Sequence, residues 1–180
     1  MAETTARIDV GGVGAEAESA AQEEAPFQGP KRLVIVITKG TIDEAYPALI
    51  LATSAAASGM DVDLYFTFWG MKLIDKRTSD NPKLASVGNP ALPMPNILGM
   101  LPGMTAMATR MMKKQIAKYW PTVPEMMKQA KEMGCRFHAC SPTMGLMGLT
   151  EENLIPEVDD IIGATTFLQY ASDNAITIFI

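Results

Sequence analysis

The chain has 180 residues, of which 48% are hydrophobic and 19% are charged, and its formal net charge is −5. This composition suits one ordinary domain with a sizeable core, and the acidic balance without a basic stripe gives no reason to expect a nucleic-acid partner. Two cysteines are not the disulfide framework of a small secreted domain, and we find no signal peptide and no apolar run of membrane-spanning length, so we expect a cytoplasmic protein.

The first half of the chain predicts a strand, a helix and a second strand. Residues 1–29 are small, acidic and without period, so we expect a flexible tail before one domain over residues 30–180. The domain opens with RLVIVITKG, a continuous apolar run typical of a strand buried on both faces of a parallel sheet. A helix over residues 41–59 and a second strand over residues 61–70 complete a βαβ unit.

The second half predicts more helix and at least two more strands. Helices are expected over residues 96–118 and 121–134, followed by a strand over residues 135–141. A helix over residues 161–173 precedes a closing strand, AITIFI, and an additional short strand is weakly indicated between Val158 and Ile161. This order predicts a three-layer α/β/α domain with a mostly parallel sheet of about four to five strands.

Polar residues at the expected helix starts predict how these helices are capped. Thr41 and Glu44 have the spacing of a capping box, in which the two side chains bond reciprocally to backbone amides. Thr122 is expected to cap the helix over residues 121–134. Asp159 or Asp160 is expected to cap the last helix.

The stretch GCRFHACSPTMGLMGL, residues 134–149, holds both cysteines and the only histidine. Cys140 is expected at the carboxyl end of the third strand, where active groups of open parallel sheets gather. Ser141 suits the cap and Pro142 the first position of a following helix. Free amides and the helix dipole would then favour the thiolate, which is the nucleophilic form. The alternative is that Cys140 is a small buried hydrophobe without chemistry.

Cys135 and His138, which lie near Cys140 in the sequence, are weaker candidates for a chemical role. Cys135 starts the strand, about 16 to 17 Å away if the strand is extended, which is too far for a disulfide within one chain. It remains a candidate second thiol, and a redox sensor that pairs Cys135 and Cys140 from different subunits is a minor alternative. His138 shares a strand face with Cys140, although a lone histidine in a strand is more often a satisfied packing residue. One histidine and two cysteines at these spacings do not make a closed tetrahedral metal site, and we expect no metal and no cofactor.

Methionines are concentrated in the middle of the chain. Met100, Met104, Met107 and Met111 recur on one face of the expected helix, which favours a packed stripe. An exposed apolar surface for subunit packing or for a partner is the main alternative. Flanking lysines leave a membrane-surface helix as a third and weaker interpretation.

Several motifs together resemble those of the DsrE/DsrF-like sulfur-relay proteins, in particular the branch of DsrE-like sulfur carriers and sulfurtransferases that is sometimes labelled peroxiredoxin-like. They are VIVITKG, DVDLYFTFWGMKLI, the methionine-rich middle and FHACSPTMGLMGLTEENL, within residues 31–180. The resemblance implies an α/β/α domain that forms oligomers, often trimers or their multiples, and a cysteine that carries sulfane sulfur as a persulfide. Cys140 matches that cysteine, and Cys135 matches no family motif. The implied partners are sulfur-donor and sulfur-acceptor proteins, including small carriers of the TusA kind.

We therefore expect a sulfur carrier in which the Cys140 thiolate takes a sulfane sulfur and yields it to an acceptor thiol. Trp69 would form a wall of the pocket, and Gly145 and Gly148 would allow tight turns beside the thiol. The residues expected to support the site are Ser141, Pro142, Thr143, Gly145, Trp69, Gly70, Lys39 and Gly40. The alternative is an oligomeric scaffold or accessory subunit in which Cys140 is only structural.

Overall fold

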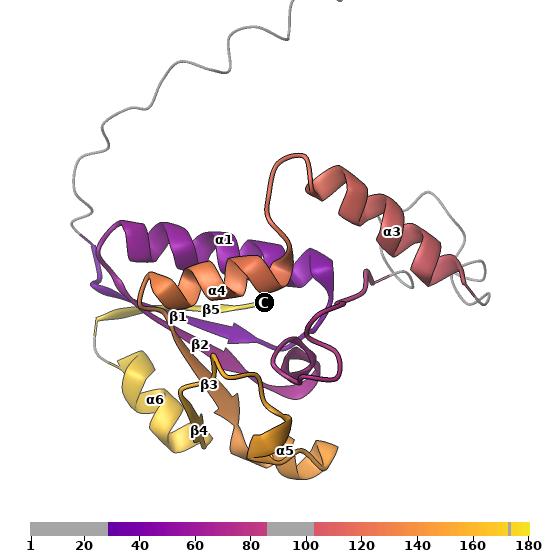
Figure 1. The fold of residues 1–180 in the computed structure, drawn as a ribbon. Coiled ribbons are helices and arrows are strands. Elements are labelled where there is room, and N and C mark those ends of the chain that lie inside the picture. Colours follow the sequence, from indigo (N-terminus) through magenta and orange to yellow (C-terminus); the bar gives the residue numbers. More distant parts are fainter. Residues whose placement is uncertain (1–28, 86–102, 173) are drawn as a thin grey trace, which may run out of the picture.

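The computed structural model describes residues 29–85, 103–172 and 174–180. The five strands in this part of the chain are β1 (Arg32–Ile37), β2 (Asp61–Phe66), β3 (Arg136–Cys140), β4 (Asp160–Ile162) and β5 (Ala175–Phe179). They form one sheet in the order β4–β3–β2–β1–β5 (Figure 1), and each neighbouring pair is parallel. The expectation of a mostly parallel sheet of four to five strands is confirmed.

Seven helical segments accompany the strands in the described residues. The α-helices are α1 (Ile42–Ala57), α3 (Met104–Ile116), α4 (Val123–Glu132), α5 (Ser141–Met147) and α6 (Ala164–Ser172). Two short 3-10 helices are η1 (Phe68–Leu73) and η2 (Glu151–Asn153). No helix among the described residues is both long enough and apolar enough to cross a membrane.

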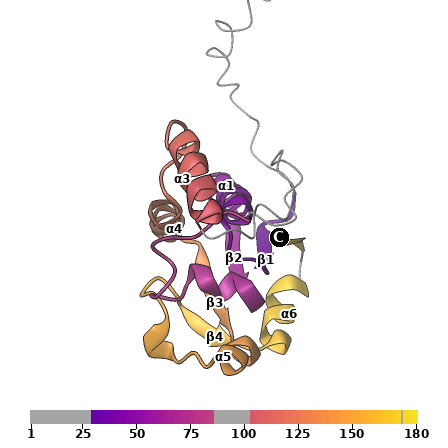
Figure 2. The same ribbon diagram turned by 90° about the vertical axis from the view of Figure 1, so that its right-hand side faces the viewer.

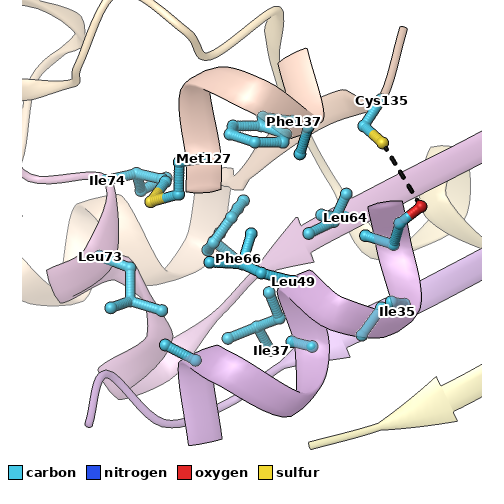
Figure 3. Packing of buried hydrophobic residues seen from close by; sticks show 14 of the residues in the cluster. Ile35, Ile37, Leu49, Leu64, Phe66, Leu73, Ile74, Met127, Cys135 and Phe137 are labelled. Atoms are coloured by element: carbon cyan, nitrogen blue, oxygen red, sulfur yellow. Dashed lines mark hydrogen bonds between the residues drawn. The ribbon is translucent and has the colours of Figure 1, made fainter. Parts of the chain in front are cut away.

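Helices cover both faces of the sheet and make the three layers that the element order predicts. α1 and α4 lie side by side on one face, whereas α6 lies on the other (Figure 1, Figure 2). The larger apolar cluster, which includes Leu64 and Phe137, fills the side of α1 and α4 (Figure 3). A smaller cluster, which includes Tyr65, Cys140 and Phe167, fills the side of α6.

Burial of apolar side chains on both faces explains why the central strands form. The last five residues of β1 and of β2 are all buried, so both faces of these strands are covered. The register pairs Ile37 with Phe66, Phe66 with Ala139, and Cys140 with Ile162. The carboxyl ends of β1, β2 and β3 therefore meet at one edge of the sheet, and the candidate site lies at that edge.

Two element boundaries differ from the predicted ones. The second strand ends at Phe66 instead of at residue 70, because the chain turns at Phe68, whose φ of 44° is left-handed, and enters η1. The last helix begins at Ala164, because residues 160–162 form β4. The extra strand indicated between Val158 and Ile161 is thus present, but it begins two residues later and ends one residue later than expected.

The predicted caps are only partly right. Thr122 caps α4 as expected, and the Glu125 carboxylate accepts hydrogen bonds from the Thr122 N–H at 2.8 Å and from its hydroxyl at 2.7 Å. Thr41 precedes α1, but its side chain makes no cap hydrogen bond, and Glu44 forms an ion pair with Lys39 at 2.7 Å. Neither expected aspartate caps α6, since both are used elsewhere on the sheet.

The packed methionine stripe is wrong for the part of α3 whose side chains are described. Met107 and Met111 are 58% and 62% exposed, whereas Ala108 and Thr109 of the same helix are buried. Small residues therefore face the protein here, and the methionines face outward. Three expectations lie outside the described residues: Met100, the start of the helix expected over residues 96–118, and nearly all of the expected tail.

Candidate functional site

Cys140 lies where β3 ends and α5 begins. It is the last residue of the strand and also the N-cap of α5, with φ −75° and ψ 109°. The cap is therefore Cys140 itself and not Ser141, which is the first helical residue. Pro142 lies in the first turn, where a missing N–H costs no hydrogen bond. The Cys140 side chain belongs to the cluster on the side of α6 and is only 6% exposed.

Polar groups from β2, the residue after it and α5 surround the sulfur of Cys140. The Thr143 hydroxyl donates to Cys140 Sγ at 3.2 Å. The hydroxyls of Thr67 and Tyr65 and the backbone N–H of Thr143 lie close enough to the sulfur to lower its pKa. The Thr143 hydroxyl in turn accepts the Phe68 N–H at 3.3 Å and lies 3.1 Å from the Thr67 hydroxyl. A connected network thus holds the thiol between β2, η1 and α5.

These donors determine the ionisation of the thiol. Burial raises the pKa of Cys140, but the hydrogen bonds from Thr143, Thr67 and Tyr65 outweigh burial, and the pKa lies below its ordinary value. Burial, together with the bond to Cys140, raises the pKa of Tyr65. Tyr65 therefore keeps its proton and acts as a donor at neutral pH.

Tyr65 and Thr67 are functional residues that the sequence analysis missed. The predicted source of activation was a set of free amides from the turn, but side-chain hydroxyls lower the pKa of Cys140 more than the one backbone amide does. Tyr65 and Thr67 alternate along DVDLYFTF, so they face the same side of the sheet. They reach the sulfur because β2 pairs with β3, which brings the carboxyl ends of the two strands together.

Cys135 is remote from this network. It lies at the amino end of β3 and belongs to the cluster on the side of α1 and α4, the face of the sheet opposite Cys140. Its thiol donates to the Ala52 carbonyl at 3.8 Å (Figure 3), and burial raises the pKa of Cys135 to about 11. Both cysteines are free. These contacts give Cys135 the character of a packing residue.

His138 is a buried ion-pair residue and makes no contact with the sulfur among the described interactions. Its Nε2 bonds to Asp63 at 2.8 Å and its Nδ1 bonds to Asp160 at 2.5 Å. Arg136 also donates to Asp63 at 2.9 Å. Burial lowers the pKa of His138, but the bonds to Asp63 and Asp160 raise it above its ordinary value. The described residues contain no group of ligands that could hold a metal ion.

The loops after β1 and β2 meet closely at Gly40 and Gly70. A Cβ atom on Gly70 would lie 2.1 Å from the Ile37 carbonyl oxygen, and one on Gly40 would lie 2.4 Å from the Trp69 carbonyl oxygen. Only glycine allows these approaches. Trp69 is 60% exposed, and it lines a cavity with Lys39 to which Cys140 does not contribute. Trp69 and Lys39 therefore lie together on the wall of this cavity, whose lining does not include Cys140.

The two glycines after Cys140 differ in their roles. Gly148 ends α5 with φ of 62°, a left-handed conformation that suits glycine. Gly145 lies inside α5, and a Cβ atom there would meet nothing within 4 Å. The tight turn predicted at Gly145 is therefore wrong, and the one at Gly148 is present.

Comparisons with known proteins agree with this architecture. Residues 29–179 match the DsrE/DsrF/DrsH-like family. The chain is 36% identical over 159 residues to the sulfur carrier protein DsrE2 of Allochromatium vinosum (83% of this chain, 98% of that protein) and 32% identical over 162 residues to the uncharacterized protein YrkE of Bacillus subtilis (83% and 97%). The chain also resembles the solved structure of MTH1491, a protein of unknown function from Methanobacterium thermoautotrophicum. The match has a TM-score of 0.53 and 12% sequence identity, and it covers 83% of this chain and 98% of that chain. This similarity supports the fold alone. The chain belongs to the DsrE/DsrF/DrsH-like family.

Proposed function

We propose that this protein is a cytoplasmic sulfur carrier, which accepts a sulfane sulfur on Cys140 as a persulfide and passes it to an acceptor thiol. The hydrogen bond from the Thr143 hydroxyl to Cys140 Sγ, within polar surroundings that lower the pKa of this thiol, is the observation that supports this function most directly. A lowered pKa increases the thiolate fraction at neutral pH, and the thiolate is the attacking species. The Allochromatium relative, which is named a sulfur carrier protein, supports the same function.

The proposed chemistry is two exchanges at one sulfur atom. In the first, the Cys140 thiolate attacks the outer sulfur of a donor persulfide. A new S–S bond forms at Sγ, the donor S–S bond breaks, and its electron pair leaves on the donor thiolate. In the second, an acceptor thiolate attacks the outer sulfur of the Cys140 persulfide, and Cys140 leaves as a thiolate. Sulfur moves at the same oxidation level, so neither step needs an external oxidant or reductant.

The donors around Cys140 serve both exchanges. When Cys140 attacks, they hold its negative charge and so increase the population that can react. When Cys140 is the leaving group, the same bonds stabilise the departing thiolate, and thiols of lower pKa leave faster. Thr143 is central to this proposal, because its hydroxyl donates directly to the sulfur and is the first of the hydrogen-bonding groups that lower the thiol pKa.

The surface next to the thiol suits contact with a protein donor or acceptor. Ser141, Pro142 and Gly145 are exposed on α5, and Leu146 is 73% exposed beside them. We expect small carriers of the TusA kind to dock here. The exposed Met107 and Met111 of α3 are apolar surface that subunit packing would cover, so we also expect a homo-oligomer, a trimer or a multiple of one.

Intact-mass measurement after treatment with polysulfide tests the proposal. The wild-type protein should gain about 32 Da for each sulfur atom bound, the mass of a persulfide sulfur. Cys140→Ser should lose this gain, and Cys135→Ser, the matched removal of the other thiol, should keep it. A gain that persists in Cys140→Ser would disprove the role of this residue.

The scaffold alternative makes the opposite prediction at the same thiol. Cys140 is only 6% exposed, which a purely structural cysteine would also be. If it were structural, the wild-type protein would gain no sulfur. Its thiol would then titrate near or above the free-cysteine value of about 8.5, since burial without activation raises a thiol pKa.

A further inference from the structure

A cavity of about 520 Å³ lies between the loops after β1 and β2 and the segment that ends at Ala85. Its walls include Gly40 and Thr41 before α1, and Trp69 and Lys72 from η1. This volume is within the range of about 300 to 1,000 Å³ that small-molecule sites usually have. Cys140 is not among its lining residues, so the cavity is separate from the site of the proposed sulfur chemistry.

The charge of the cavity is opposite to that of the whole chain. The chain carries a net charge of −5, yet the described residues that line the cavity include four basic side chains and no acidic one. Lys39 is neutralised by Glu44 at 2.7 Å, and Arg77 by its own ion pair with Asp75.

The two remaining cations of the cavity lack a carboxylate partner. Lys72 and Lys83 form no ion pair within the residues that the structure describes, although Lys72 Nζ lies 5.2 Å from the centre of the Trp69 ring. They leave two uncompensated positive charges at the cavity. Two such charges suit a ligand with two negative charges.

A hydroxyl without a partner adds to the case for a ligand. Thr41 Oγ1 is buried, and it makes no hydrogen bond with any residue that the structure describes. A buried polar atom in this condition costs about 1–3 kcal/mol, so such atoms are uncommon in native proteins. Rotation of the Thr41 side chain toward a bound oxyanion would satisfy it, since Thr41 lines the cavity.

Trp69 gives the cavity an aromatic wall with a fixed backbone. Its ring is 60% exposed. The peptide that carries it is held closely. Its carbonyl oxygen lies 2.4 Å from the position that a Cβ atom of residue 40 would have, and the Gly70 N–H donates to the Thr38 carbonyl at 3.0 Å. An exposed indole on a fixed backbone offers a flat apolar surface against which a ring can stack at low entropic cost.

We propose that this cavity binds a small organic molecule that joins a doubly negative oxyanion, such as a phosphate monoester, to a flat ring. Lys72 and Lys83 bind the oxyanion, and Trp69 contacts the ring. The site does not depend on sulfur transfer by Cys140, and binding should persist in Cys140→Ser. Failure of this proposal and failure of the proposed function are therefore distinguishable.

Calorimetric titration of the full chain with AMP, adenosine and inorganic phosphate tests the two parts of the proposal. AMP should bind more tightly than either of the others, because it alone has both the charge and the ring. Adenosine that bound as tightly as AMP would overturn the role of the lysines. Phosphate that bound as tightly as AMP would overturn the role of Trp69, and the absence of saturable AMP binding would overturn the site.

Charge-matched variants locate the binding. Lys72→Gln and Lys83→Gln should each weaken AMP binding by about tenfold, the value of one charge-assisted contact of ~1.4 kcal/mol. Lys118→Gln removes the same charge from an exposed position that does not line the cavity, and it should leave AMP binding unchanged. Trp69→Leu should weaken the binding of AMP but not of phosphate. An equal loss in Lys118→Gln would show non-specific attraction and would overturn the proposal.

Discussion

Replacement of Thr143 by valine tests the central idea that hydroxyl donors activate Cys140. The variant keeps the shape of the side chain but removes the hydroxyl that donates to Cys140 Sγ at 3.2 Å. Hydrogen bonds to charged groups contribute about 1.5–3 kcal/mol. Loss of this one should raise the pKa of Cys140 by roughly one to two units, since one pKa unit corresponds to about 1.4 kcal/mol.

The pKa of Cys140 can be measured directly from the ultraviolet absorbance of its thiolate as the pH rises. The titration uses a Cys135→Ser background, so that only one thiol titrates, and the double variant Cys135→Ser/Cys140→Ser supplies the tyrosine baseline. Thr143→Ser keeps the hydroxyl and should stay close to the wild-type pKa. Thr53→Val removes a hydroxyl that bonds only within α1, and it should change nothing at the thiol.

The stability of Thr143→Val needs a separate measurement, because its hydroxyl also accepts the Phe68 N–H. The free energy of unfolding should fall by about 1–3 kcal/mol, the usual cost of a buried donor without a partner. Titration is therefore done where urea denaturation shows the variant to be folded. If folded Thr143→Val titrated like Thr143→Ser, the hydroxyl would not activate Cys140, and the reasoning would be refuted.

Three further predictions concern the free energy of unfolding, measured by urea denaturation. The His138 pKa is raised above 6.5 in the folded state. The stabilising contribution of His138 is therefore complete below pH 6.5 and is lost as the pH rises through the folded-state pKa. A urea midpoint that did not change between these two pH values would contradict the ion pair. The Asp63 pKa is lowered, so its contribution is present above 3.8 and is lost as the pH falls through its folded-state value. Gly70→Ala should destabilise the fold by about 1–3 kcal/mol, because its Cβ would collide with the Ile37 backbone, whereas Gly145→Ala, in open space within a helix, should be neutral or stabilise by about 0.5–1 kcal/mol. Equal effects of the two alanines would show that the close approach at Gly70 is not a constraint.

The parallel sheet and the position of Cys140 could be predicted from the sequence because local patterns determine them. Continuous apolar runs indicated the central strands, and Ser141 and Pro142 after an apolar segment indicated a strand-to-helix turn. These features depend on residues within a few positions of each other. The expectation that Cys140 would lie at the carboxyl end of the third strand is confirmed.

Features that depend on contacts between distant segments could not be predicted in the same way. Tyr65 and Thr67 act on Cys140 only because β2 is the neighbour of β3, and pairing order is not encoded in either segment alone. Asp159 looked like a helix cap, but its carboxylate accepts the Phe137 N–H at 2.7 Å. The local sequence around Tyr65 and Thr67 indicated no role, and that around Asp159 indicated a different one. In each case a contact with a residue far away in the sequence determined the role.

The placement of the two thiols on opposite faces of the sheet simplifies the study of oxidation in this protein. A folded chain cannot join Cys135 to Cys140, because the sheet itself lies between them. Every disulfide that the native protein forms must then connect two polypeptides or attach a small thiol. A band of doubled mass on a non-reducing gel therefore reports an encounter between molecules, without interference from internal cross-links.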